Sequence, residues 1–229
     1  MTALPVKGGL VTLDPRLDRV PQFDVRSLDY PITATLEAKR PRSYTWQGGP
    51  VTDQGREGAC VGHGWTGDLT ARPVPVVVPN PGDYAYRLYR RCQQIDEWPG
   101  EAYSGTSVLA GAKELTARGL IKSYAWAFGL SDLVLGIGYR GPAVLGIPWY
   151  ESMYKADGGL VTVAGDQVGG HCILARGVSV RRRTFLLRNS WGTGWGRGGD
   201  ALIGWDDLER LLHEGGEACI PTIRAHAAP

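Results

Sequence analysis

The chain has 229 residues, of which 43% are hydrophobic and 21% charged, a balance typical of a globular protein. Its formal net charge of +2 is too small to indicate nucleic acid as a main partner. The N-terminus lacks the basic start and apolar run of a signal peptide, and no segment has the length of a transmembrane helix. We therefore expect no membrane contact and a cytoplasmic location. The spacing of the cysteines indicates no disulfide framework, which favours a reducing compartment.

Residues 1–41 are predicted to form an extended arm, and residues 42–229 the globular body. Five prolines interrupt the arm, and no helical period is sustained along it. Its apolar residues are too many to leave in water without a partner surface: Leu10, Val11, Leu13, Leu17, Val20, Phe23, Val25 and Leu28. We expect the arm to lie ordered along the body and to restrain access to a substrate cleft. The alternative is a tail that only docks the chain onto a partner protein.

Four helices are predicted in the first part of the body. One begins at Cys60 and ends before Pro73, and the glycines inside it indicate close packing against another element. The others are a helix from Tyr84 to about Gln93 capped by Asp83, one from about Ser107 to Arg118, and a short one capped by Ser131.

The second part of the body is predicted to be rich in strands. Strands are expected at 141–147, 171–178 and 184–190, the last two as a hairpin, followed by a helix from Trp205 to His213 and a strand at 219–223. Because helices come first and strands later, the chain is predicted to be an α+β protein with two lobes.

Cys60 is the candidate nucleophile. At the start of a helix, unpaired backbone N–H groups and the helix dipole favour the thiolate, so we expect a lowered pKa for Cys60. Such a nucleophile needs a histidine as general acid and base. His171 is preferred over His63, because strand alternation in the hairpin brings Asn189 beside it. Asn189 would then orient the ring, and Trp191 would shield their hydrogen bond from water.

These residues, in this order, resemble the papain-like cysteine peptidases. The resemblance rests on Gln54-Gly55, on Cys60 six residues after Gln54, on Gly169-Gly170-His171, and on the block NSWGTGWG at 189–196. It implies a helical N-terminal lobe and an antiparallel β-sheet or barrel C-terminal lobe, with the active-site cleft between them. It also implies peptide-bond hydrolysis through an acyl-enzyme, without cofactor or metal.

Carried over residue by residue, the resemblance assigns each site residue a role. Cys60 becomes the nucleophile, His171 the acid/base and Asn189 its orienting group, while Gln54 and the Cys60 backbone N–H become the oxyanion hole. Gly105, Gly170 and Trp191 are expected to contact a peptide or protein substrate. Other pocket residues are expected within 103–107 and 143–149 and at Cys172.

The sequence also departs from the family pattern. Glu57 stands where a disulfide cysteine is common, Val61 replaces an aromatic residue, and His63 has no counterpart. The arm is too short for the long helical propeptide, so the chain resembles the compact bacterial or viral members.

Four other interpretations remain open at this stage. The same acyl-enzyme would serve a transpeptidase or amidase, and a structural or binding module would keep the site without turnover. Cys60 would otherwise be a buried structural cysteine, the usual fate of a free cysteine. A zinc site would use Cys60, His63, His171 and Cys172, but adjacent strand residues such as His171 and Cys172 point to opposite faces.

Overall fold

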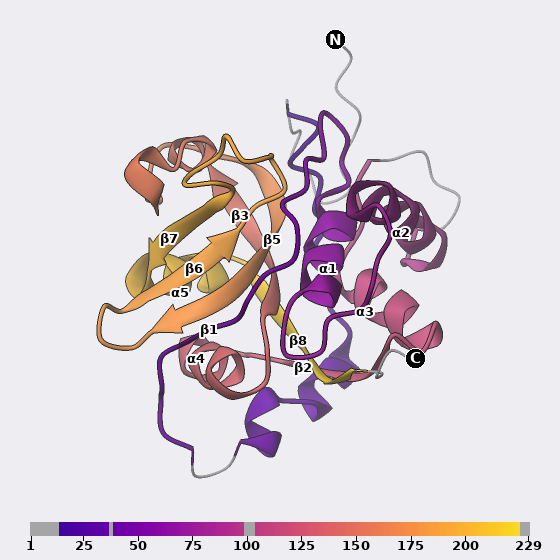
Figure 1. The fold of residues 1–229 in the computed structure, drawn as a ribbon, viewed down its shortest axis with the longest axis horizontal. Coiled ribbons are helices and arrows are strands. Elements are labelled where there is room, and N and C mark those ends of the chain that lie inside the picture. The colour runs from indigo at the N-terminus through magenta and orange to yellow at the C-terminus, as the bar shows by residue number, and fades with distance from the viewer. Residues whose placement is uncertain (1–13, 37–38, 99–103, 225–229) are drawn as a thin grey trace.

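The computed structural model describes residues 14–36, 39–98 and 104–224. A helical lobe carries α1 (Cys60–Thr70), α2 (Pro81–Ile95) and α3 (Val108–Ala117), and it lies beside a lobe built on a twisted sheet (Figure 1). Two further helices, α4 (Leu130–Tyr139) and α5 (Trp205–His213), pack on the sheet lobe. The predicted α+β two-lobed fold is confirmed.

The start of α3 agrees with the predicted position, whereas the starts of α2 and α4 differ from it. Helix α3 begins after Ser107, whose hydroxyl accepts a hydrogen bond from the Ala110 N–H, as an N-cap should. Helix α2 begins earlier than predicted, because Pro81 occupies its first turn and Asp83 lies inside the helix rather than at the cap. The predicted cap at Ser131 is wrong, since α4 already begins at Leu130.

The glycines of α1 allow the close packing that their position predicted. A Cβ on Gly62 would overlap the Ala85 carbonyl oxygen of α2, and one on Gly64 would press on the Cys172 sulfur of the sheet. Helix α1 is therefore held against both lobes, and Cys60 at its first residue lies where they meet.

The strands, in chain order, are β1 (Tyr44–Thr45), β2 (Ile121–Trp126), β3 (Ala143–Tyr150), β4 (Leu160–Val161), β5 (Gln167–Ser179), β6 (Thr184–Arg188), β7 (Asp200–Gly204) and β8 (Glu217–Arg224). They form one sheet in the order β2-β8-β3-β5-β6-β7-β4, with β1 paired to β5. All pairs are antiparallel except β4 with β7. Strands β1, β2, β4 and β7 were not predicted.

Two apolar cores stabilise the two lobes. The core of the sheet lobe includes Trp149, Phe185 and Ile203, and the core of the helical lobe includes Trp65, Leu69 and Leu115. Among the described residues, no helix combines the length and apolar character that crossing a bilayer needs.

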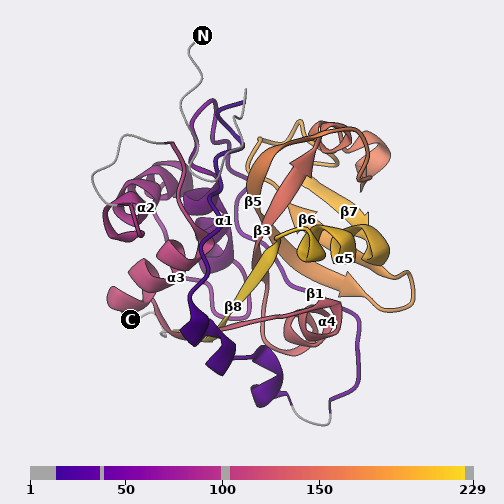
Figure 2. The same ribbon diagram turned by 180° about the vertical axis from the view of Figure 1, so that it is seen from behind.

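The described part of the arm runs between the lobes. Figure 2 shows it, in indigo, passing between the helices and the sheet before it reaches two short 3₁₀ helices, η1 (Val25–Asp29) and η2 (Ile32–Thr35). Ile32 and Leu36 are buried in the core of the sheet lobe, so these residues pack as part of the body. The boundary between residues 41 and 42 stays a prediction.

The apolar residues of the arm divide into two groups. Leu17 and Val20 are each 1% exposed, whereas Phe23, Val25 and Leu28 are 70%, 68% and 52% exposed. Burial of these last three was expected and is wrong, because the arm turns into the surface helix η1 there. Leu10, Val11 and Leu13 lie outside the described residues.

Candidate active site

Cys60 is the first residue of α1, and its side chain is fully buried. The backbone of Cys172 on β5 forms a hydrogen bond with its sulfur. Burial raises the pKa of Cys60 to about 12. The expected lowering of this pKa is wrong for the structure as it stands, because desolvation outweighs the N–H groups at the helix start.

His171 and Asn189 meet across the strands β5 and β6. The ring Nε2 of His171 lies 2.8 Å from Asn189 Oδ1, and Asn189 follows directly after the last residue of β6. The ring is fully buried between Trp149 and Trp191, with centroids 4.6 and 4.9 Å away. Burial lowers the pKa of His171 to about 4, although the Asn189 hydrogen bond opposes this shift. The imidazole is therefore neutral at physiological pH.

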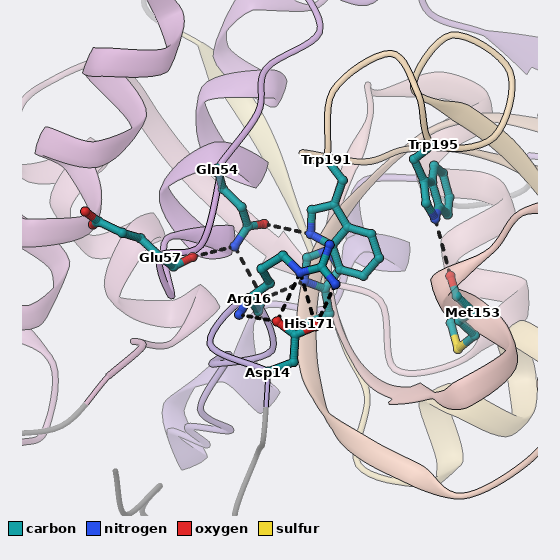
Figure 3. A network of polar contacts seen from close by, with 8 residues as sticks. All are labelled: Asp14, Arg16, Gln54, Glu57, Met153, His171, Trp191 and Trp195. Carbon is teal, nitrogen blue, oxygen red and sulfur yellow. Dashed lines mark hydrogen bonds and ion pairs between the residues drawn. The ribbon is translucent and has the colours of Figure 1, made fainter. Parts of the chain in front are cut away.

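Gln54 is held so that its amide nitrogen points into the site (Figure 3). Its Oε1 accepts hydrogen bonds from Ser190 Oγ at 2.7 Å and from Trp191 Nε1 at 3.2 Å. Its Nε2 donates to the Glu57 carbonyl oxygen at 2.8 Å and to the Arg16 carbonyl oxygen at 3.3 Å. Since the acceptor end is fully engaged, the amide orientation that serves an oxyanion is fixed in advance.

The arm fills the space in front of these groups. The Arg16 carbonyl oxygen lies 3.3 Å from His171 Nδ1 as well as from Gln54 Nε2. The Arg16 guanidinium stacks over Trp191, with Cζ 4.3 Å from the ring centroid, and pairs with Asp14 at 2.6 Å (Figure 3). A peptide carbonyl of the chain itself therefore sits where the two polar side chains of the site converge.

The glycines expected to bind substrate contact the arm. Gly105 has φ +90°, and a Cβ there would overlap the backbone of Asp18. Gly170 accepts a hydrogen bond from the Arg19 N–H at 3.1 Å and donates to the Leu17 carbonyl oxygen at 3.4 Å. On the other side of the arm, the Val20 N–H donates to the Thr106 carbonyl oxygen at 3.0 Å. The arm is thus bonded along both edges of the cleft, as an extended peptide would be.

His63 lies one turn along α1 and does not join the pair. Its Nδ1 is 2.8 Å from Thr52 Oγ1, and its ring packs edge-on against Tyr86. Burial lowers its pKa to about 4. Among the described residues, no group of three or more His, Cys, Asp or Glu side chains is arranged to hold a metal ion. The four cysteines, including Cys92 and Cys219, are buried and free.

Three contributors to the site were not identified from the sequence: Ser190, Arg16 and Asp14. Trp149, which packs on His171, lies in the range 143–149 where pocket residues were expected. Ser190, which orients Gln54, belongs to the NSWGTGWG block, so its segment had a sequence signal. Arg16 and Asp14 had none, since nothing local in the arm reveals which surface it covers.

Comparison with known proteins gives a result for the fold. No family model and no curated protein matches the sequence. Xylellain, a cysteine protease from Xylella fastidiosa, superposes with a TM-score of 0.68 at 17% identity, covering 93% of this chain and 98% of that one. Procathepsin L 3 of Tenebrio molitor larval midgut has a TM-score of 0.58 at 16% identity, covering 93% and 75%. The bromelain protease from Ananas comosus, in complex with the E64 inhibitor, has a TM-score of 0.60 at 13% identity, covering 81% and 100%. The chain therefore has the fold of the papain-like cysteine proteases.

Proposed function

We propose that the protein is a cysteine peptidase that cleaves peptide bonds through an acyl-enzyme on Cys60. The observation that supports the proposal is the His171–Asn189 pair, with the Arg16 carbonyl oxygen of the arm within 3.3 Å of both His171 and Gln54, and with the Cys60 sulfur at the backbone of Cys172, the residue after His171. The similar structures include proteins described as cysteine proteases, which supports the same chemistry here.

In the proposed reaction, His171 takes the thiol proton of Cys60, and the sulfur attacks the carbonyl carbon of the peptide bond. Gln54 Nε2 and the Cys60 backbone N–H donate to the oxyanion that forms. The intermediate collapses to a thioester as the C–N bond breaks, and His171 gives its proton to the leaving amine. Water then attacks the thioester with His171 as base, which releases a carboxylic acid and restores the thiol.

Asn189 is the positioning residue of this mechanism. Its Oδ1 accepts the Nε2–H of His171, which leaves Nδ1 as the nitrogen that exchanges protons with thiol and substrate. Trp149 and Trp191 cover this bond on both sides of the ring and keep water from competing for it.

We also propose that the arm holds the enzyme latent. With Arg16 and Leu17 in place, the thiol pKa is near 12 and the imidazole pKa near 4, so both groups are neutral. Displacement of the arm would hydrate both groups, which lowers the thiol pKa and raises the imidazole pKa, so that the thiolate and imidazolium forms become more populated.

The proposal also includes a cytoplasmic location and the compact bacterial or viral type of this family. It further includes an arm that can bind a docking partner when it leaves the cleft.

The proposal is tested by cleavage profiling of a complex peptide mixture with the wild-type protein and with Cys60→Ala. New peptide termini that depend on Cys60 are expected. An added amine nucleophile distinguishes hydrolysis from transpeptidation, since ligated products in place of free carboxylates would assign the chain to the second class. Identical termini with both proteins would reject thiol catalysis and leave a binding module.

A further inference from the structure

His63 joins the helix that carries Cys60 to the loop that carries Gln54. It lies one turn after Cys60 on α1, and its side chain is 2% exposed. Its Nδ1 is 2.8 Å from Thr52 Oγ1, which is a hydrogen-bond distance. Thr52 stands two residues before Gln54 in the chain. A side-chain hydrogen bond therefore connects the two segments whose N–H groups form the proposed oxyanion hole.

Backbone hydrogen bonds fix the other side of this loop. The Gly192 N–H donates to the Thr52 carbonyl oxygen at 3.1 Å, and the Gln54 N–H donates to the Ser190 carbonyl oxygen at 2.8 Å. Both contacts tie the loop to the segment that follows β6 in the sheet lobe. The bond from His63 supplies the tie to α1, so the loop is held from both lobes.

The separation between Gln54 and Cys60 decides whether both can donate to one oxygen. Gln54 Nε2 is carried by the loop and the Cys60 N–H by the first turn of α1, so the proposed oxyanion hole is divided between two elements. Donors to an oxyanion act at about 2.7–3.1 Å, and a small drift of the loop weakens this contact. A buried side chain that is hydrogen-bonded between the two elements limits such drift.

The surroundings of His63 keep its ring in one place and neutral. The ring packs edge-on against Tyr86 of α2, with the centroids 5.2 Å apart. Within the described chain, its Nε2 is buried without a hydrogen-bond partner, so the polar contact of the ring is the one at Nδ1. Burial lowers the pKa of His63 to about 4; Asp53 opposes this shift and His171 adds to it. A neutral ring also avoids repelling the imidazolium that His171 becomes in the proposed reaction.

We propose that His63 is a positioning residue, which fixes the loop of Gln54 relative to Cys60 through Thr52 and so aligns the two donors of the oxyanion hole. This rests on the proposed peptidase function. In this role His63 touches neither the substrate nor the reacting atoms, so its loss slows the chemical step without removing the acid/base. The role also accounts for a histidine that has no counterpart in the papain-like pattern.

The test measures kcat and KM separately in the full chain with Leu17→Ala, which truncates a buried side chain of the arm. The arm competes with substrate for the cleft, so a change in its position alters KM and not kcat. His63→Leu removes the ring nitrogen and keeps an apolar side chain in its place, whereas Thr52→Val removes the partner hydroxyl without touching α1. Each is expected to lower kcat about fivefold without raising KM, the factor for one neutral hydrogen bond.

Two further variants separate positioning from loss of packing. The double variant of His63→Leu with Thr52→Val is expected to lose about fivefold in kcat, as each single variant does, because both remove the same bond. His63→Asn is expected to restore kcat to within about twofold of the background, because its amide offers a donor and an acceptor near the place of Nδ1 and so suits either tautomer.

Thr66→Val is the matched control for Thr52→Val. Thr66 is fully buried on the same helix, and its hydroxyl donates to the Gly62 carbonyl oxygen at 2.7 Å inside α1. Its substitution makes the same chemical change away from the loop and is expected to leave kcat unchanged. Alkylation of Cys60 by iodoacetamide forms no oxyanion, so its rate should not fall in any of these variants.

The outcomes distinguish the positioning role from the peptidase itself. An unchanged kcat in His63→Leu and Thr52→Val, a double variant that loses the product of the two single losses, or a fall in Cys60 alkylation alongside kcat would overturn the positioning role and leave the peptidase intact. Failure of His63→Asn to restore kcat would do the same.

If His63→Leu does not melt cooperatively, the comparison of Thr52→Val with Thr66→Val decides alone. Absence of turnover in the Leu17→Ala background, with Cys60 also unreactive towards a thiol probe, would overturn the peptidase and the role of His63 with it.

Discussion

Leu17→Ala tests the guarding role of the arm. Leu17 is 1% exposed and packs in the core of the sheet lobe, one residue after the carbonyl that meets His171 and Gln54. Truncation of a buried leucine costs about 2–5 kcal/mol, and the cost falls on the closed arm because the open arm exposes this side chain in any case. At about 2 kcal/mol, the ratio of open to closed molecules rises about 30-fold.

The expected result is a rise of about 30-fold in kcat/KM on a small fluorogenic peptide, as long as the open form is the minor one. The rate of Cys60 alkylation by iodoacetamide at neutral pH should rise in parallel, since hydration lowers the thiol pKa from its value near 12. Phe23→Ala is the control, because Phe23 lies in the same arm and is 70% exposed. It should change neither rate.

The reasoning is refuted if Leu17→Ala melts cooperatively and still hydrolyses peptide and alkylates at the wild-type rates. The arm would then be a tether. Truncation at residue 40 is a poorer test than this substitution, because it removes Ile32 and Leu36 from the core of the body.

Three further predictions concern the titrating groups. Cys60→Ser should lower peptidase activity at least about a thousandfold with an unchanged melting temperature, and full activity would reject the nucleophile. His63→Ala should keep kcat/KM within about tenfold of wild type, whereas His171→Ala should lose about a hundredfold or more; the reverse order would exchange their roles. The pKa values of both histidines are lowered to about 4 by burial, so the stability they add is present above pH 6.5 and is lost as the pH falls towards 4. The pKa of Asp18, raised to about 6 by burial, acts in the opposite direction, since its contribution is lost as the pH rises through 6. Over this pH range each histidine contributes about 3 kcal/mol to the free energy of unfolding. Urea unfolding should therefore give a lower free energy of unfolding at pH 4.5 than at pH 7, and the difference should be smaller in His63→Gln than in the wild type. An equal difference in the wild type and in His63→Gln would contradict the lowered pKa of His63.

The parts of the fold predicted correctly are those that local patterns determine. The start of α1 at Cys60, the start of α3 near Ser107 and the hairpin of β5 with β6 all have short-range signals. Strand β2 was missed because its outward residues carry Lys122 and Ser123 without a clear alternation. Strand β7 was missed because it is a short segment flanked by glycines.

The residues of the site also divide into those with a local sequence signal and those without one. Cys60, His171, Asn189 and Gln54 lie in motifs with distinctive spacing. In the structure His171 contacts Asn189, the Arg16 carbonyl oxygen lies between His171 and Gln54, and the Cys60 sulfur meets the backbone of Cys172, the residue after His171. The contact of Arg19 with Glu217 joins residues 198 positions apart, and no local pattern indicates it. The expected direction of the Cys60 pKa shift was wrong because burial in the folded chain raises this pKa, and the local sequence at the helix start does not reveal that burial.

The central claim is that Cys60 carries the acyl group during turnover. Mass spectrometry of Leu17→Ala, quenched in acid during hydrolysis of an activated peptide ester, measures this directly. The account predicts one acyl group, on the peptide that contains Cys60 and on none of the other three cysteines, with much less in His171→Ala and none in Cys60→Ala. Acylation at another residue, or peptide hydrolysis by Cys60→Ala, would contradict it.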